Sequence, residues 1–455
     1  MADRTGHAVV VGAGLSGLLT AQVLARRFAR VTVIERDTVT GEAGAFRAGV
    51  PQARHVHIFW SRGLAAMDAL LPGTVAELEA AGASLVGAPE EMRWLSPAEW
   101  FTGVTGASYL SVSRELLEAT LRHRVLDGSP SITLLDRHEV TGLVAADGTE
   151  AVTGVRFRER GEVGQEATLD AELVVVAAGR SSRPAQWLTQ LGRPAPAVER
   201  IDAHLGYSSR YFRRPDTGTG WKAMYLQGNA ELPRGGVMNP IDGGRWLVTL
   251  IGQGAHQPPV EEKAWWAYAA SLRSDELARA LADAEPLSDP VAFRATANEW
   301  THFERADRPP RGFLVVGDAL CRFNPVYGHG MSVAATQAQE IARQLSTLGA
   351  AQFAARSGEI QRAVAQRARG AWAIATGEDR CYPDVEGPTP GLLTRLQQGY
   401  MGRVLATSNT DPLVAEALFA VLSLNRRPES LLSPRIMSRT TRRRNGSGSS
   451  NSKRL

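Results

Sequence analysis

The chain has 455 residues, 44% of them hydrophobic and 22% charged, an ordinary globular composition that excludes a mostly disordered chain, a collagen-like repeat and a coiled-coil rod. The net charge of +4 comes from residues 435–455, which hold seven basic and no acidic side chains, whereas the rest carries 44 basic and 47 acidic residues. Outside this tail the charges do not form a basic face, so the sequence predicts that the protein binds no nucleic acid. No apolar segment is long enough for a membrane span or a secretory signal, and the only cysteines are Cys321 and Cys381, so the sequence predicts a cytoplasmic protein.

The N-terminal residues predict a strand, a helix and a second strand. His7–Gly12 is a short apolar run typical of a buried parallel strand. Apolar residues then recur at helical spacing, and Val31–Ile34 forms the second strand, which ends at Glu35. This β-α-β unit of about 30 residues is the context in which a glycine fingerprint indicates dinucleotide binding.

The fingerprint is Gly12-x-Gly14-x-x-Gly17, between the strand and the helix. Gly12 allows the tight turn, Gly14 lets the backbone approach a pyrophosphate, and Gly17 lets the helix pack closely on the strand. We expect the pyrophosphate at the helix N-terminus and the ribose hydroxyls on Glu35, with the adjacent Arg36 as a further cofactor contact.

The rest of the chain alternates helix and strand patterns. Helices are predicted over residues 61–82, from 113 onward, and over 261–284, 331–346, 350–376 and 391–424. Strands are predicted within residues 90–112, 131–145, 151–158, 171–178 and 313–316, and an antiparallel sheet within 196–295.

A second constellation follows in the last third of the chain. The strand at residues 313–316 ends in Gly317-Asp318, and Asn324-Pro-Val-Tyr-Gly-His-Gly-Met-Ser332 leads into a helix. Together with the fingerprint, these segments resemble the FAD-dependent monooxygenases of the para-hydroxybenzoate hydroxylase fold. The resemblance implies an aspartate on the ribityl chain of FAD, a loop beside the flavin ring, and a helix whose N-terminus points at the flavin pyrimidine. The positions that match are Asp318, Gly328, Gly330 and Met331.

Three segments narrow this resemblance. They are similar to segments of the bacterial epoxidases of monensin and lasalocid biosynthesis. The segments are Arg47–Trp60, Asn324–Ser332 and Trp372–Thr376 with Tyr382-Pro383. The similarity runs from about residue 7 to 425 and implies an epoxidase that acts on isolated alkenes, related in chemistry to squalene epoxidase.

The resemblance also assigns two arginines. Arg47 and Arg114 match arginines that position the FAD pyrophosphate, a task suited to the planar guanidinium, although either of them can also be an ordinary surface arginine. His55 and His57 alternate in an extended stretch, but no third ligand completes a metal site, so we expect no metal.

One position departs from the family pattern. Aromatic hydroxylases of this fold carry an Asp-Gly pair after the strand at residues 173–176, and the pair contributes to FAD and nicotinamide binding. Here the segment is Ala177-Ala178-Gly179-Arg180, with Arg183 close behind. Because Ala178 replaces the aspartate, we expect NAD(P)H alone to reduce the flavin poorly, and a separate flavin reductase to supply electrons.

These features predict an FAD-dependent monooxygenase. The resemblance implies that reduced FAD reacts with molecular oxygen to a C4a-hydroperoxide, which transfers oxygen to an alkene of a polyketide, terpenoid or prenylated intermediate. Such chemistry needs an apolar, water-excluding site more than acid–base residues. No catalytic residue is assigned with certainty, and Pro325, Tyr327 and Trp60 are the candidates for lining the site.

Four alternatives remain open. An aromatic hydroxylase of the same fold would profit from a general base that activates a phenol. A flavin halogenase fits less well, because the Trp-x-Trp-x-Ile-Pro segment of that family does not occur. A flavin reductase of isoprenoid double bonds and a non-catalytic flavin-binding protein complete the list.

The predicted fold class is α/β. It comprises an FAD-binding Rossmann-like domain of the glutathione-reductase type, a discontinuous α+β substrate domain on an antiparallel sheet, and a helical C-terminal region. The FAD-binding parts are 1–85, 113–195 and 296–346, the substrate parts are 86–112 and 196–295, the helical region is 347–430, and a disordered basic tail is expected at 431–455.

Overall fold

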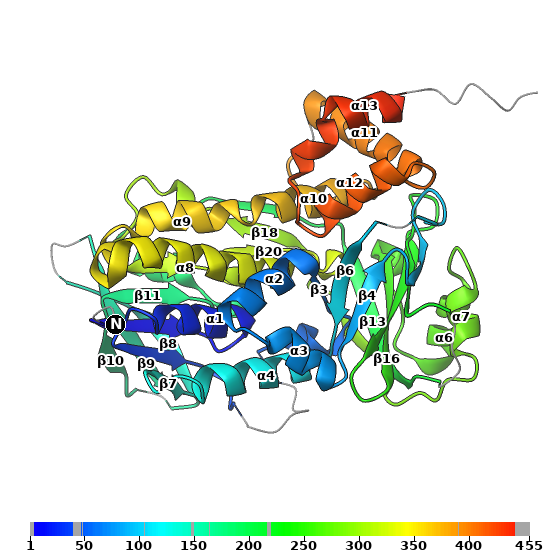
Figure 1. The fold of residues 1–455 in the computed structure, drawn as a ribbon. Helices are drawn as coiled ribbons and strands as arrows, with labels where there is room; N and C mark the ends of the chain where they lie inside the picture. Colours follow the sequence, from blue (N-terminus) through cyan, green and yellow to red (C-terminus); the bar gives the residue numbers. More distant parts are fainter. Residues whose placement is uncertain are drawn as a thin grey trace, which may run out of the picture.

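The computed structural model describes residues 4–39, 47, 49–103, 105–146, 150–162, 164–215, 220–389 and 391–441 (Figure 1). Its first sheet has five parallel strands in the order β19-β11-β1-β2-β7. Every residue of β1 and β11 is buried, because short valine-rich runs suit strands that are covered on both faces. The strands are β1 (His7–Val11), β2 (Arg30–Ile34), β7 (Ile132–Leu135), β11 (Leu173–Val176) and β19 (Phe313–Val315).

Helices and a small sheet pack next to these strands. Helix α1 contacts α4 and α8, and the antiparallel sheet β10-β9-β8 contacts β11 and β2. Ser113 caps α4, because its side chain accepts a hydrogen bond from the Leu116 N–H at 3.1 Å. The elements of this part are α1 (Leu15–Leu24), α2 (Ser61–Leu70), α3 (Thr74–Ala80), α4 (Arg114–Leu126), β8 (His138–Ala145), β9 (Val152–Glu159), β10 (Ala167–Asp170), α5 (Pro184–Gln190), α8 (Gly330–Ala355) and α9 (Ser357–Gln366).

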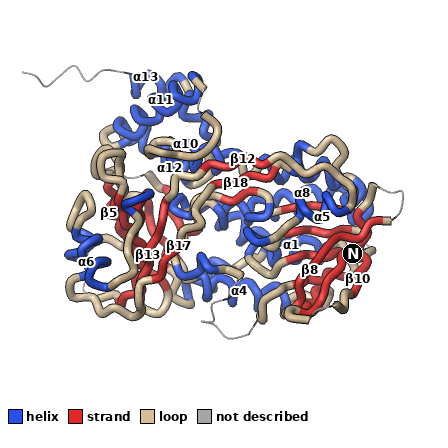
Figure 2. The backbone as a smooth tube through the Cα atoms, turned by 180° about the vertical axis from the view of Figure 1, so that it is seen from behind, coloured by secondary structure: helices blue, strands red, loops and turns tan. Residues whose placement is uncertain are grey.

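A second, larger sheet lies at the other end of the molecule (Figure 1). Its six strands run in the order β17-β13-β16-β15-β14-β5, and only β5 and β14 pair in parallel. Seen from behind, β12 and β18 run between the two parts (Figure 2). The elements are β5 (Met92–Leu95), β13 (Leu205–Arg213), β14 (Ala223–Leu226), β15 (Arg234–Ile241), β16 (Arg245–Gln253), β17 (Val291–Phe293), α6 (Glu262–Ala270) and α7 (Glu276–Leu281).

Two three-stranded sheets connect these parts. They have the orders β3-β6-β4 and β12-β18-β20. Their strands are β3 (Ile58–Trp60), β4 (Ser84–Ala88), β6 (Ala107–Ser111), β12 (Val198–Ile201), β18 (Asn298–Thr301) and β20 (Cys321–Arg322).

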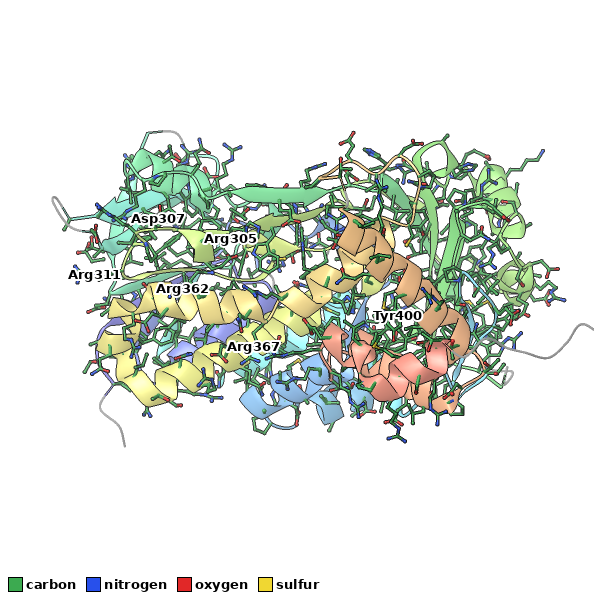
Figure 3. All side chains as sticks on the ribbon, turned by 90° about the horizontal axis from the view of Figure 1, so that it is seen from above. Arg305, Asp307, Arg311, Arg362, Arg367 and Tyr400 are labelled. Carbon is green, nitrogen blue, oxygen red and sulfur yellow. The ribbon has the colours of Figure 1, made fainter. Side chains whose placement is uncertain are left out.

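The C-terminal helices form a bundle above the junction of the two parts (Figure 1). Tyr400 lies inside this bundle (Figure 3), where its hydroxyl donates to the Leu431 carbonyl at 2.7 Å. The helices are α10 (Arg369–Asp379), α11 (Leu392–Ser408), α12 (Pro412–Leu422) and α13 (Pro434–Thr441).

The C-terminal tail corrects one prediction. Disorder was expected from residue 431, but residues 434–441 form α13, because Ile436 and Thr440 are buried against the bundle and Arg439 pairs with Asp411 at 2.6 Å. Residues 442–455 lie outside the described residues.

The predicted α/β fold class is confirmed, with a parallel sheet beside helices, an antiparallel sheet and a helical C-terminal region. The domain boundaries stay a prediction. Within the described ranges, no helix has both the length and the apolar character needed to cross a membrane.

Candidate functional site

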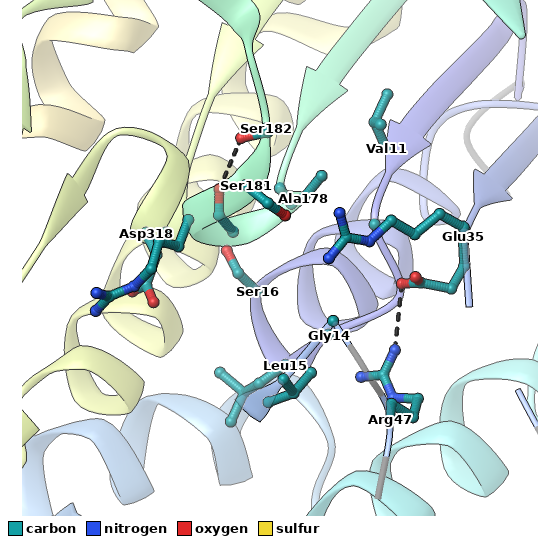
Figure 4. Close-up of a pocket in the computed structure, with 18 of the residues that line it drawn as sticks. Val11, Gly14, Leu15, Ser16, Glu35, Arg47, Ala178, Ser181, Ser182 and Asp318 are labelled. Carbon is teal, nitrogen blue, oxygen red and sulfur yellow. Dashed lines mark hydrogen bonds and ion pairs between the residues drawn. The ribbon is translucent and has the colours of Figure 1, made fainter. Parts of the chain in front are cut away.

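A cleft of about 740 Å³ opens at the carboxyl ends of β1, β2, β11 and β19, where open α/β sheets bind their ligands. We call it the glycine-loop cleft (Figure 4). Ten of the eleven predicted cofactor-binding residues line it, and Gly17 lies behind them in α1. The ten are Gly12, Gly14, Glu35, Arg36, Arg47, Arg114, Asp318, Gly328, Gly330 and Met331.

The glycine loop has the shape that a pyrophosphate needs. Gly12 has φ +104°, and a Cβ on Gly17 would overlap the Gly12 carbonyl, so neither position accepts a larger residue. A Cβ on Gly14 would meet nothing within 4 Å, which leaves the approach to α1 open. Helix α1 has no side-chain cap, and the Ser16 hydroxyl is buried without a hydrogen-bond partner among the described residues. Unpaired N–H groups and an orphaned hydroxyl fit an anionic diphosphate.

Glu35 is held in place by the same loop. Its carboxylate accepts the Ala13 N–H at 2.7 Å and the Asp37 N–H at 3.0 Å, and Arg47 Nη1 lies 3.2 Å from it (Figure 4). The Arg36 side chain is 39% exposed, and its Nε lies 4.0 Å from Asp37. The carboxylate is therefore fixed at the end of β2, where the sequence predicts contact with ribose.

Arg47 and Arg114 meet at a residue that sequence reasoning missed. Glu118 accepts Arg47 Nη2 at 2.5 Å and Arg114 Nε at 2.7 Å. Burial acts to raise the pKa of Glu118, but Arg114 and Arg47 outweigh it, so the pKa lies below its usual value. The i,i+4 spacing of Arg114 and Glu118 on one helix was the available signal. Neither arginine is the ordinary surface residue of the alternative interpretation, because their side chains are only 8% and 12% exposed.

Asp318 stands on the opposite side of the α1 N-terminus from Glu35 (Figure 4). It follows β19 and makes no hydrogen bond to a described residue, so its carboxylate is available to hydroxyl groups in the cleft. Helix α8 begins beside it at Gly330 without a side-chain cap. A Cβ on Gly328 would overlap Ile58, which explains why a glycine stands two residues before the start of α8.

The departure from the family pattern also lies in the cleft. Ala178, Arg180 and Arg183 line its edge. Arg180 donates to the Ala295 carbonyl, and burial lowers its pKa despite the opposing effect of nearby Asp318. Arg180 and Arg183 therefore line the same cleft as the glycine loop.

A second cavity of about 110 Å³ adjoins the cleft, and we call it the aromatic cavity. The two share Val56, Ile58, Pro325 and Gly328 as lining residues. Of the candidates for lining the reaction site, Pro325 lies at this junction, whereas Trp60 and Tyr327 line only the aromatic cavity. Its other rings and apolar side chains include Trp94, Phe101, Tyr109, Tyr225, Val237, Ile374, Leu405 and Leu418.

A buried polar network supports the loop between the two cavities. Asp379 on α10 accepts the Tyr327 hydroxyl at 2.5 Å, the Asn298 amide at 2.5 Å and the Asn324 amide at 3.0 Å. Burial raises the pKa of Asp379 to about 7, against the lowering effect of these hydrogen bonds. Sequence reasoning missed Asp379, because no local motif links α10 to a loop more than fifty residues earlier.

His55 and His57 line different cavities. His57 lines the glycine-loop cleft, and its Nδ1 lies 2.7 Å from the His55 carbonyl. His55 lines the aromatic cavity, and its Nδ1 lies 2.7 Å from Ser209 Oγ. Burial lowers the pKa of His55 to about 4 and that of His57 to about 3, so both rings are neutral at pH 7. Across the described residues, no three His, Cys, Asp or Glu side chains are grouped so that they could hold a metal ion.

The family described as FAD binding domain matches residues 6–377. The chain belongs to this family. Protein Rv3254 of Mycobacterium tuberculosis (strain ATCC 25618 / H37Rv) is 33% identical over 440 residues, which cover 93% of this chain and 91% of that protein. FAD is therefore the cofactor, and the open glycine loop, the orphaned Ser16 hydroxyl and the available Asp318 carboxylate are consistent with it.

Solved structures show the same fold. The flavin-dependent brominase Bmp2 is similar with a TM-score of 0.65 at 16% identity, over 92% of this chain and 93% of that one. PqsL, a probable FAD-dependent monooxygenase from Pseudomonas aeruginosa, has a TM-score of 0.60 at 18% identity, over 91% and 99%. The myxobacterial chondrochloren halogenase CndH has a TM-score of 0.59 at 18% identity, over 94% and 98%. The chain is thus a flavoprotein with a monooxygenase-type fold.

Proposed function

We propose that the protein epoxidises an alkene of a polyketide, terpenoid or prenylated intermediate, as an FAD-dependent monooxygenase. The observation that carries the proposal is the aromatic cavity, which adjoins the glycine-loop cleft at Pro325 and Gly328 and is lined mainly by apolar and aromatic side chains. An alkene lacks strong hydrogen-bonding groups, so shape and burial must position it. The similarity of residues 47–60 and 324–332 to polyether epoxidases supports the same reaction.

When bound and reduced, FAD supplies the activation of molecular oxygen. The chain supplies binding, orientation and exclusion of water. Asp318 and Glu35 would hold the ribityl and ribose hydroxyls, and the start of α1 would hold the diphosphate. Trp60, whose indole N–H donates to the Tyr327 carbonyl at 3.2 Å, would fix the loop against which the alkene lies.

Labelled molecular oxygen tests the proposal. With reduced FAD and an alkene-bearing polyketide, terpenoid or prenylated substrate, one labelled atom should appear in an epoxide. Leu418→Trp is the matched variant, because Leu418 lines the aromatic cavity but not the cleft. It should keep the visible FAD spectrum and lose epoxide formation. Labelled epoxide at the wild-type rate in this variant, or no epoxide in the wild type, contradicts the proposal.

Aromatic hydroxylation is a second candidate, favoured by the Tyr327–Asp379 hydrogen bond. Tyr327 donates to the carboxylate and lines the aromatic cavity, so its oxygen could accept the proton of a phenol while its own proton moves to Asp379. Label found as a ring hydroxyl on a phenol, with Asp379→Asn slowing that reaction, would select this candidate.

A further inference from the structure

One carboxyl group in the aromatic cavity has no partner. Glu378 on α10 lines the cavity, and its carboxyl group makes no hydrogen bond or ion pair to a described residue. Its neighbour Asp379 points into the network with Tyr327, Asn298 and Asn324. The two adjacent carboxyls therefore differ: one holds the loop, and the other faces the space where a ligand would lie.

Aromatic residues line the same cavity as this carboxyl, Trp94, Tyr225 and Tyr327 among them. Burial, and to a smaller extent charged neighbours that include Glu378, raises the pKa of Tyr225, Tyr327 and Tyr382. Burial likewise raises the pKa of Glu378 itself. Among the described residues, no arginine or lysine lines the cavity. An acidic group in an aromatic cavity whose described lining has no arginine or lysine lacks the cation of a buried ion pair.

We propose that the aromatic cavity selects a largely apolar substrate that carries a basic amine, and that Glu378 is the residue that binds the ammonium group. The ammonium would provide Glu378 with the missing opposite charge and hydrogen-bond donors. The aromatic rings of Tyr225 and Tyr327, which line the same cavity, would add cation–π attraction. A carboxylate or phosphate substrate would meet Glu378 with no compensating cation, so the cavity discriminates against anions.

This inference rests on the proposed function, because it names the substrate class of the same site. Ligand binding can nevertheless be measured without turnover. The probes are phenylpropylamine, phenylpropanol and phenylpropanoate, which share one apolar body and differ in the polar end. Each is titrated into the oxidised, FAD-loaded protein by calorimetry, with no reductant present. We expect the amine to bind at least about tenfold more tightly than the alcohol, and the carboxylate to bind most weakly.

Glu378→Gln keeps the shape of the side chain and removes its charge. It should reduce the affinity for the amine to within about threefold of that for the alcohol and leave the alcohol unchanged. The matched control is Glu416→Gln on α12, whose side chain is 60% exposed, and it should keep the wild-type ranking. FAD content and melting temperature confirm that both variants are folded.

Equal affinity for amine and alcohol, tightest binding of the carboxylate, no binding of the amine, or an amine preference that survives Glu378→Gln overturns the inference. Amine selectivity without oxygen transfer to any alkene would reject only the proposed function. Epoxidation of neutral alkenes by a protein that ignores the amine would reject only the inference.

Discussion

The glycine-loop cleft and the aromatic cavity meet at the same loop but treat charge differently. In the cleft, Arg47 and Arg114 share Glu118, and Glu35 is bonded to the backbone, so that these charges are paired before any ligand arrives and Asp318 is left for the hydroxyl groups of FAD. In the cavity, Glu378 has no partner among the described residues. Paired charges suit a cofactor that stays, since its site must be rigid. A carboxyl such as Glu378, in a cavity whose described lining holds no arginine or lysine, suits a ligand that comes and goes and brings the missing charge.

The largest expected effect breaks the pairing in the cleft. Glu118→Ala leaves Arg47 and Arg114 buried without a shared carboxylate, which should lower the free energy of unfolding by about 3–5 kcal/mol. Urea unfolding of the FAD-saturated protein measures it. The control is Glu77→Ala, which removes the ion pair between Glu77 and Arg124. The Glu77 side chain is 42% exposed, so this variant should lower the same free energy by at most about 1 kcal/mol. Equal losses in both variants would show that the network does not stabilise the cleft.

The next effect concerns the cofactor alone. Asp318→Ala removes a carboxylate that has no partner among the described residues, so the free energy of unfolding of the FAD-free protein should hardly change. FAD binding should weaken by about 1.5–3 kcal/mol for each charged hydrogen bond that is lost, a factor of about ten or more in Kd. Titration of the apoprotein with FAD, followed by flavin fluorescence, measures this Kd. Wild-type affinity in the variant would remove Asp318 from the set of FAD contacts.

A smaller effect tests the network between the two regions. The pKa of Asp379 is about 7 in the folded protein and 3.8 as its ordinary value. Between these two pH values Asp379 is protonated in the folded protein and ionised in the unfolded chain. Proton binding by Asp379 therefore stabilises the folded state fully below about pH 4, and this stabilisation is lost as the pH rises through 7. Asp379→Asn cannot titrate, so its free energy of unfolding relative to the wild type should rise by about 2 kcal/mol between pH 5 and 7. Urea titrations at both pH values measure this difference, and a constant difference would contradict the assignment.

The sequence predicted the first region far better than the second, and the reason is distance along the chain. Gly12, Gly14 and Glu35 lie within one β-α-β unit, where turn and helix geometry follow from local residue types. The hydroxyl of Tyr327 donates to Asp379 on α10, which also accepts the amide of Asn298 on β18, and only tertiary packing brings these residues together. No local pattern marks a lone glutamate such as Glu378 as a cavity residue. The helix at 434–441 was missed for the same reason, since its sparse apolar positions are buried only against other helices.

The smallest expected effect is the response to NADPH. Ala178 lies at the edge of the cleft, where the family pattern has an aspartate, and its methyl group can neither accept a hydrogen bond nor orient a cationic nicotinamide ring. Nearby Arg180 does not replace that acceptor, because its guanidinium carries only hydrogen-bond donors, one of which is bonded to the Ala295 carbonyl. Anaerobic mixing with NADH or NADPH, with and without substrate, should therefore leave the oxidised flavin band nearly unchanged over seconds. A separate reductase that supplies reduced flavin should restore turnover, and Ala178→Asp should increase direct reduction. Bleaching within seconds by NADPH alone would contradict an external electron supply and show that the alanine at this position has no effect on reduction.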